Sequence, residues 1–214
     1  MLGLYIGIIL LLNIPYVQHR MSVLVAKELS TVLGSELTVG RINIGLLNRI
    51  IIDDLVLNDQ SGKELLKIGR LSAKFEILPL FSGKISIGNV QLFSFNANLE
   101  RPTPQASTNF QFVLDAFASK DTVKKKSNLD LRINSLLIRR GKVSYDVLSA
   151  ESTPGKFNPQ HIRLSNILAN ISLKALQSDS INAAIKRMSI EEDHSGFELK
   201  KLSLKIVANN KKMW

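Results

Sequence analysis

The spacing of apolar residues changes along the chain, and each change predicts a different kind of element. Residues 1–17 are almost uninterruptedly apolar, with Arg20 the first charged residue, which predicts one continuous apolar helix. Residues 18–35 carry apolar side chains at helical spacing with polar ones opposite, so we expect an amphipathic helix that stops at Gly34. From residue 36 onward apolar and polar positions alternate, which is typical of strands with one apolar and one polar face.

Turn-forming segments separate the alternating runs, so residues 36–214 are expected to form one mainly β domain, a long antiparallel meander. The alternation slips by one residue within several runs, and a β-bulge or a sharp bend is expected at each slip. The slips fall at Asp53-Asp54, Gly88-Asn89, Ser135 and Asn166. One stretch with helical spacing, residues 109–118, predicts a single short inserted helix.

The apolar segment 1–17 is at the lower limit of a membrane-spanning helix, which needs about 17 to 25 residues. A cleaved signal peptide is the main alternative, but the segment has neither a positively charged start nor a small-residue cleavage site. A buried core helix is a weaker alternative, because no polar face interrupts residues 2–12. We therefore expect a retained transmembrane anchor over residues 1–17, with the helix over 18–35 capping the β domain.

The composition indicates a folded chain without a reaction centre. Of the 214 residues 45% are apolar and 21% are charged, a balance that excludes a disordered chain. The absence of cysteine excludes disulfides, thiolate nucleophiles and cysteine-ligated zinc. His19, His161 and His194 fit no metal-binding spacing, and the chain has no glycine-rich phosphate loop. We expect no enzyme, and no catalytic, metal or cofactor site.

The formal net charge of +10 is compatible with either nucleic acid or an anionic lipid surface as partner. The basic residues gather at residues 124–126, at Arg139-Arg140 and at Lys200-Lys201. A nucleic-acid site interleaves such residues with aromatic side chains that stack on bases. Most of the phenylalanines lie instead in the apolar runs of the middle third, so no nucleic-acid partner is expected.

Three stretches resemble a known family. The first runs from the apolar start into residues 37–44 (LTVGRINI), and the second is residues 78–85 (LPLFSGKI). The third, residues 131–146, has a spacing close to L-x-I-x-x-L-x-I-x-x-G-x-V-x-Y-D. In this order after an apolar start, they resemble the N-terminal region of the AsmA-like proteins, and most closely the TamB (translocation and assembly module) family.

The resemblance implies a U-shaped β-groove, or β-taco, whose long strands line a trough with apolar side chains. It implies a single-pass inner-membrane protein with its bulk in the periplasm, which moves phospholipid between the two membranes. It also implies an outer-membrane barrel of the Omp85 or TamA type as partner. Family members are usually far longer and carry a cytoplasmic basic flank, so this chain is expected to be a fragment of a longer protein.

Our leading hypothesis is therefore an apolar β-groove that shelters phospholipid acyl chains, with about 0.8 kcal/mol gained for each methylene group removed from water. The candidate lining residues are Ile42, Ile44, Ile52, Phe75, Ile85, Ile87, Phe93, Phe95, Ile133, Ile138 and Ile171. A second hypothesis is an assembly factor that pairs outer-membrane protein strands with its open sheet edge. A third is a scaffolding domain that forms a closed β-sandwich without a ligand.

Overall fold

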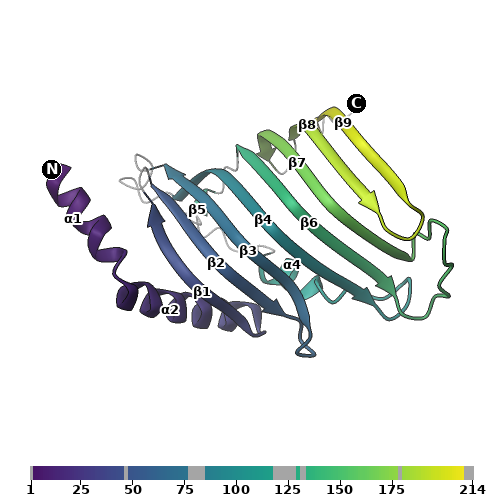
Figure 1. Ribbon diagram of the computed structural model, residues 1–214, viewed down its shortest axis with the longest axis horizontal. Helices are drawn as coiled ribbons and strands as arrows, with labels where there is room; N and C mark the ends of the chain where they lie inside the picture. Colours follow the sequence, from purple (N-terminus) through teal and green to yellow (C-terminus); the bar gives the residue numbers. More distant parts are fainter. Residues whose placement is uncertain are drawn as a thin grey trace, which may run out of the picture.

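The computed structural model describes residues 2–45, 48–76, 85–117, 129–130, 134–177 and 180–209, and it shows two N-terminal helices followed by one large sheet (Figure 1). The helices are α1 (Leu2–Leu12) and α2 (Pro15–Leu33). The predicted amphipathic helix is α2, which begins three residues earlier than expected. It ends as predicted at Gly34, whose φ of 64° is left-handed.

The break between the two helices is caused by Pro15. The residue before a proline is disfavoured in the helical conformation, and Ile14 is extended, with φ −65° and ψ 131°. The 11 residues of α1 give it a length of about 16 Å, roughly half the hydrocarbon thickness of a bilayer. The predicted single helix over residues 1–17 is therefore not formed. Over the residues that the structure describes, no helix combines the length and the apolar character needed to cross a membrane.

All the described strands belong to one sheet. They are β1 (Leu37–Gly45), β2 (Arg49–Asn58), β3 (Glu64–Glu76), β4 (Ile85–Arg101), β5 (Leu129–Asp130), β6 (Ser135–Val147), β7 (His161–Gln177), β8 (Ser180–Glu192) and β9 (Phe197–Asn209). Eight of them follow one another in the order β1-β2-β3-β4-β6-β7-β8-β9, and the two-residue β5 pairs beside β4. The predicted meander is confirmed in this coarse form, as a mainly β, mostly antiparallel sheet.

One junction departs from the expected antiparallel pattern, because β4 and β6 are parallel. Parallel neighbours need a long crossover connection, and residues 102–134 supply it. This connection contains the short helix α4 (Gln111–Phe117), which lies within the predicted helical stretch. The sheet is therefore two four-stranded antiparallel meanders joined by one parallel pair.

The tightest packing lies at one end of the sheet, where the helices meet the strands. Leu33 of α2 forms a buried cluster with Leu37, Leu57 and Leu65. The partly buried residues packed against this cluster come from α2, the strands and the segment around α4: Ala26, Leu29, Val39, Leu66, Leu99, Phe110, Phe112, Val113 and Ala116. The helices thus cover the apolar side chains at this end of β1–β4.

Helix α2 also runs along the outer edge of β1. Near its start, Asn13 Nδ2 donates to the carbonyl oxygen of Ile44 at 2.7 Å. Near its end, the hydroxyl of Ser30 accepts from the backbone N–H of Leu37 at 2.9 Å. These contacts use backbone groups of β1 that an added strand would otherwise pair with, so α2 protects this edge.

The rest of the sheet is a single layer (Figure 1). The chain exposes 14,804 Å², whereas a compact protein of this 23.8 kDa mass exposes about 9,900 Å². The described strands therefore do not form the two stacked sheets of a closed β-sandwich.

A change of phase crosses this sheet. In β2 the apolar side chains at Ile50 and Ile52 are followed by Leu55 and Leu57, so the alternation shifts by one residue at Asp53-Asp54. A residue in the left-handed region makes such a shift, and Asp54 has φ 56°. The same shift occurs in all eight long strands. The residue pairs at which it occurs, which we call the crease, are Gly40-Arg41, Asp53-Asp54, Gly69-Arg70, Phe93-Ser94, Arg139-Arg140, Ser165-Asn166, Lys186-Arg187 and Lys200-Lys201.

From β1 to β6 the crease stays in register. Arg41 pairs with Asp53, Asp53 with Arg70, Arg70 with Phe93 and Phe93 with Arg139, without a shift in pairing. From β6 to β9 the crease moves by a few residues between neighbouring strands, and register shifts occur at these places. The slips predicted at Asp53-Asp54 and Asn166 are confirmed by their positive φ, and the one at Gly88 by a register shift opposite it. At Ser135 β6 begins, and because residues 131–133 before it lie outside the described ranges, the slip predicted there stays a prediction.

Candidate functional site on the apolar face

Two unbroken rows of apolar residues run across all eight long strands on one face. Residues paired in a ladder share a face, so each row can be followed from pair to pair. Row one is Ile42, Ile52, Leu71, Leu92, Ile138, Ala169, Met188 and Leu202. Row two lies two residues from row one on each strand, or three residues from it on β8. Its members are Ile44, Ile50, Ala73, Val90, Leu136, Ile171, Ile185 and Leu204.

Most of these side chains are neither buried nor fully exposed. Only Ile42 and Ala169 are buried, and Leu204 on the edge strand β9 is 48% exposed. The remaining members of both rows are half-buried. In the described part of the chain, α2 and α4 pack at the other end, on the Leu37 and Leu57 side of the crease. The two rows are therefore a broad apolar surface over which the described residues place no second layer.

Across the crease the apolar face continues toward the helices. Val39 pairs with Leu55, Leu55 with Ile68, and Ile68 with Phe95. The ring of Phe95 lies over Gly141, which pairs with Ile167. The phase change therefore keeps apolar residues on the same face on both sides of the crease, which strict alternation would not do.

The opposite face is polar. Beside row one lies a ladder of Arg41, Asp53, Arg70, Phe93 and Arg139, in which Nε of Arg70 donates to Oδ1 of Asp53 at 2.6 Å. This bond raises the pKa of Arg70 above its ordinary value. The next ladder is mostly polar too, interrupted by Ile51 and Leu137. The sheet therefore has two chemically distinct faces.

The residues selected from the sequence divide between these faces. Five of them lie in the two rows and Phe95 lies on the apolar face across the crease, whereas Phe93 lies in the polar ladder between Arg70 and Arg139. The five are Ile42, Ile44, Ile52, Ile138 and Ile171. Phe75 pairs with Ile87, and Ile85 begins β4, but the description of these three stops at the backbone. Ile133 lies outside the described residues.

The same rows contain residues that the sequence analysis did not select, including Leu71, Leu92, Met188 and Leu202. Each belongs to an alternating run, so the signal was present. The sequence does not show how the strands pair, and only the register of that pairing shows that Leu92 and Ile138 share a face.

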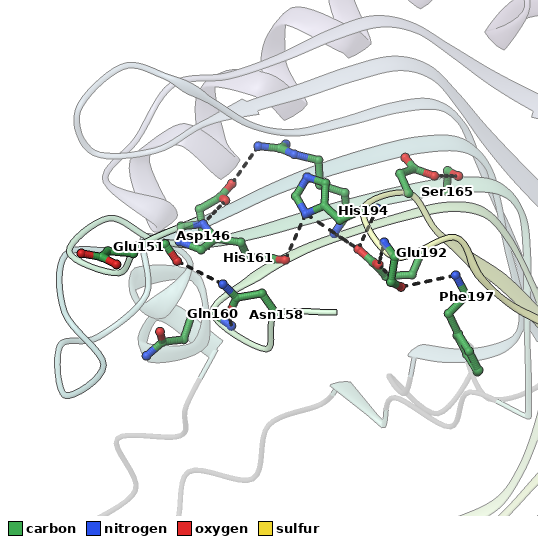
Figure 2. A network of polar contacts seen from close by, with 12 residues as sticks. Asp146, Glu151, Asn158, Gln160, His161, Ser165, Glu192, His194 and Phe197 are labelled. Atoms are coloured by element: carbon green, nitrogen blue, oxygen red, sulfur yellow. Dashed lines mark hydrogen bonds and ion pairs between the residues drawn. The ribbon is translucent and has the colours of Figure 1, made fainter. Parts of the chain in front are cut away.

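A polar network fastens the far end of β6–β9 (Figure 2). Nδ1 of His161 lies 2.9 Å from Oδ1 of Asp146, and its Nε2 lies 3.0 Å from the carbonyl oxygen of Ala150. Both partners are acceptors, so both ring nitrogens donate when the imidazole is protonated. The bond to Asp146, with that to Ala150, raises the pKa of His161 above its ordinary value.

The second centre of the network is Glu192, whose side chain is only 2% exposed. Its carboxylate accepts from the hydroxyl and backbone N–H of Ser195 at 2.5 and 2.7 Å, and from the backbone N–H groups of Arg163 and His194 at 3.3 Å. Burial alone would raise the pKa of Glu192, but these hydrogen bonds outweigh it and lower the pKa to about 2. The carboxylate is held charged as a structural anchor for the β8–β9 turn.

These polar groups make no recognisable catalytic arrangement. Within the described ranges, no group of three or more metal-ligating side chains comes together. Glu192 accepts from backbone and hydroxyl donors and Asp146 has the side chains of His161 and Arg163 as partners, so both carboxylates are already satisfied, which is the pattern of a structural cluster.

The two apolar rows are therefore the surface of this fold that is best suited to bind an apolar ligand. Compared with known proteins, the chain matches no protein-family model and no curated protein.

Proposed function

We propose that this protein is a non-enzymatic, membrane-associated lipid carrier of the AsmA-like, TamB type, in which the apolar face of the sheet shelters phospholipid acyl chains. The observation that carries the proposal is the pair of unbroken apolar rows, half-exposed across eight strands. Exposed apolar areas this continuous are rare on monomeric proteins and mark interaction sites.

The size of the surface and the energy of transfer both suit acyl chains. Eight strands about 4.8 Å apart make a face about 34 Å wide. Each methylene group withdrawn from water contributes about 0.8 kcal/mol, so two chains of about 16 carbons, half covered, gain on the order of 11 kcal/mol. No specific headgroup contact and no turnover chemistry are required for such binding.

The proposed shape is the U-shaped β-groove, with the crease supplying the bend. Left-handed residues such as Asp54 on β2, Ser94 on β4 and Arg140 on β6 are a known way to bend a sheet sharply. Helices α2 and α4 close the groove at the Leu37 end.

The proposal includes an inner-membrane location with the bulk of the chain in the periplasm, as the resemblance implies, and α1 supports a membrane contact. Ile6, Leu10 and Leu11 of α1 are exposed, and the chain has no charged residue before Arg20. An apolar helix of this kind gains free energy by entering a bilayer, whether it spans the bilayer or not.

Site-specific photocrosslinking tests the proposal. A photoreactive phenylalanine analogue at Leu92 in row one is expected to form phospholipid adducts when the full chain is irradiated in membranes, read by mass spectrometry. The matched control is the same analogue at the neighbouring residue Gln91, which lies on the polar face. Equal adducts at both positions, or none at Leu92, would contradict the proposal.

A second candidate function is supported by the unequal edges of the sheet. The β1 edge is bonded to α2, whereas none of the described strands pairs with the outer edge of β9. An assembly factor that holds strands for an Omp85-type or TamA-type barrel would use such an edge for strand pairing.

Because the chain has no cysteine, Ser203→Cys places a single thiol on β9, and Asn43→Cys places one on β1 as the control. Crosslinks from β9 but not from β1 to an unfolded barrel, without lipid adducts at Leu92, would favour this candidate.

A further inference from the structure

The crease has a chemical consequence on the polar face. In an ordinary strand two consecutive side chains point to opposite faces. At the phase change they do not: Arg139 and Arg140 both lie exposed between Ile138 and Gly141, which both belong to the apolar face. Arg140 adopts the left-handed φ of 55°, uncommon for a residue with a long side chain, and this conformation makes the shift possible.

The same arrangement recurs on β8 and β9. Lys186 and Arg187 are both exposed between Ile185 and Met188 of the apolar rows. Lys200 and Lys201 are likewise both exposed, between the half-buried Leu199 and Leu202. We call these six residues of β6, β8 and β9 the dibasic steps.

The dibasic steps lie close together. Each is next in sequence to the row-one residue of its own strand, Ile138, Met188 or Leu202, and these three belong to one continuous row. The β6 and β9 steps lie just beyond row one and the β8 step lies between the two rows, so all three fall within a few residues of row one across strands that span about 14 Å. Between them, β7 contributes the uncharged Ser165 and Asn166.

Little in the described part of the chain neutralises this charge. Lys200 has an exposed ion pair with Glu198 at 3.6 Å, whereas the other five cations form no ion pair with a described residue. The nearby Glu191 accepts from Asn166 at 2.6 Å. A hollow of about 910 Å³ is lined by the cations Arg139, Arg140 and Lys200 and by the carboxylates Glu191 and Glu198 among other residues, and it has enough room for a phosphate-bearing headgroup.

We propose that the dibasic steps form a docking surface for an anionic phospholipid bilayer, whose headgroup phosphates they contact. The proposal rests on the proposed function in one respect, the choice of lipid as the phosphate-bearing partner. A surface of clustered cations is complementary to an anionic bilayer, and each Lys or Arg near such a surface contributes about 1 kcal/mol, about fivefold in binding. Nucleic acid is the less favoured partner, because Phe93 is the single aromatic residue among those that line the hollow, too few for successive bases to stack on.

Vesicle flotation of the full chain tests this proposal. Vesicles of phosphatidylcholine mixed with phosphatidylglycerol are compared with vesicles of phosphatidylcholine alone, so that any insertion of α1 contributes to both. Tighter binding to the anionic vesicles is expected, and it should weaken as salt is raised. Inorganic phosphate and soluble glycerophosphoglycerol are not expected to compete at concentrations that leave ionic strength unchanged, because neither presents an extended surface.

The variants remove two charges at a time. Arg139→Gln with Arg140→Asn, Lys186→Gln with Arg187→Gln, and Lys200→Gln with Lys201→Gln should each weaken the anionic component of binding about 30-fold. Asparagine is chosen at position 140 because it tolerates a positive φ. The matched control is Lys67→Gln with Lys74→Gln, two exposed cations on the polar face of β3, which should lose far less. Unfolding midpoints are measured for every variant, and only folded ones are compared.

Three outcomes would overturn the proposal: no preference of the unaltered chain for anionic vesicles, an equal loss in the β3 control, or equally tight binding of DNA that the same variants abolish. Its failure is distinguishable from failure of the proposed function. Lipid adducts at Leu92 without a preference for anionic vesicles would contradict only the docking surface. A preference for anionic vesicles without adducts at Leu92 would contradict only the acyl-chain groove.

Discussion

The ring of Phe95 on β4 lies over Gly141 on β6, in the space that a side chain at position 141 would need. The two residues join the two four-stranded meanders on the apolar face, where the only parallel pair among the long strands is found. The absence of a Cβ at Gly141 is thus what allows this aromatic ring to cover the junction.

Gly141→Ala is expected to lower the free energy of unfolding by about 1 to 3 kcal/mol, because the ring of Phe95 must leave its position to admit the methyl group. Urea unfolding measures the change. Gly7→Ala in α1, where nothing lies within 4 Å of the added atom, is the control and should not destabilise. Adding Phe95→Leu to Gly141→Ala should recover part of the loss, and a double variant no better than the sum of the singles would contradict the assigned contact.

Ser94 tests the crease itself, since its φ of 52° is disfavoured for every residue with a Cβ and most for branched ones. Ser94→Val should destabilise by about 1 to 3 kcal/mol, whereas Ser94→Gly should change stability by less than about 1 kcal/mol. Gln91→Val, three residues away on the same strand and without a positive φ, should be nearly neutral. Thermal unfolding of the three variants suffices, and equal effects at positions 91 and 94 would argue against backbone strain at the crease.

Leucines at the two ends of the sheet should respond differently to truncation. Leu57 is buried in the cluster with α2, so Leu57→Ala should cost about 2 to 5 kcal/mol. Leu92 in row one has no second layer over it, and Leu92→Ala should cost only about 1 kcal/mol. Phospholipid or a mild detergent should raise the unfolding temperature of the unaltered chain, and raise it less for Leu92→Asp. Equal costs for the two alanine variants would mean that row one is packed like a core.

The low pKa of Glu192 predicts a loss of stability in acid. A carboxyl whose pKa is lowered from 4.5 to about 2 on folding stabilises the folded chain above pH 4.5, and this contribution disappears as the pH falls from about 4.5 to about 2. Glu192→Gln replaces one acceptor oxygen by a donor, so it should cost about 1 to 3 kcal/mol at neutral pH. It should also flatten the dependence of the unfolding midpoint on pH in that acid range, and an unchanged slope would contradict the role assigned to this carboxylate.

Much of the fold could be predicted from the alternation of residues alone. The period-two pattern identified the strands, and the shifts at Asp53-Asp54 and Asn166 marked two points of the crease. The shift at Arg139-Arg140 was not predicted, because Gly141, the next residue of the apolar face, contributes no apolar side chain. The parallel pairing of β4 with β6 could not be predicted, since it is decided by where a 33-residue connection returns to the sheet.

The candidate site was only partly predictable for a related reason. Alternation tells which residues of one strand share a face, but it does not tell which face two strands have in common. Phe93 and Phe95 both belong to an apolar run, and only the intervening Ser94 in its left-handed conformation sends them to different faces. Pro15 itself indicates a helix break at this point, but the uninterrupted apolar composition of residues 1–17 favoured the prediction of one continuous helix.

The crease divides every long strand into two segments of opposite parity. Odd-numbered residues of β4 face the apolar side in one segment and even-numbered residues do so in the other, with Ser94 between them. A one-residue insertion or deletion on either side of this point therefore turns half a strand inside out, but a change made at the crease itself could be absorbed there. The crease is thus a place in each long strand where the sheet can tolerate a change of length without exchanging its apolar and polar surfaces.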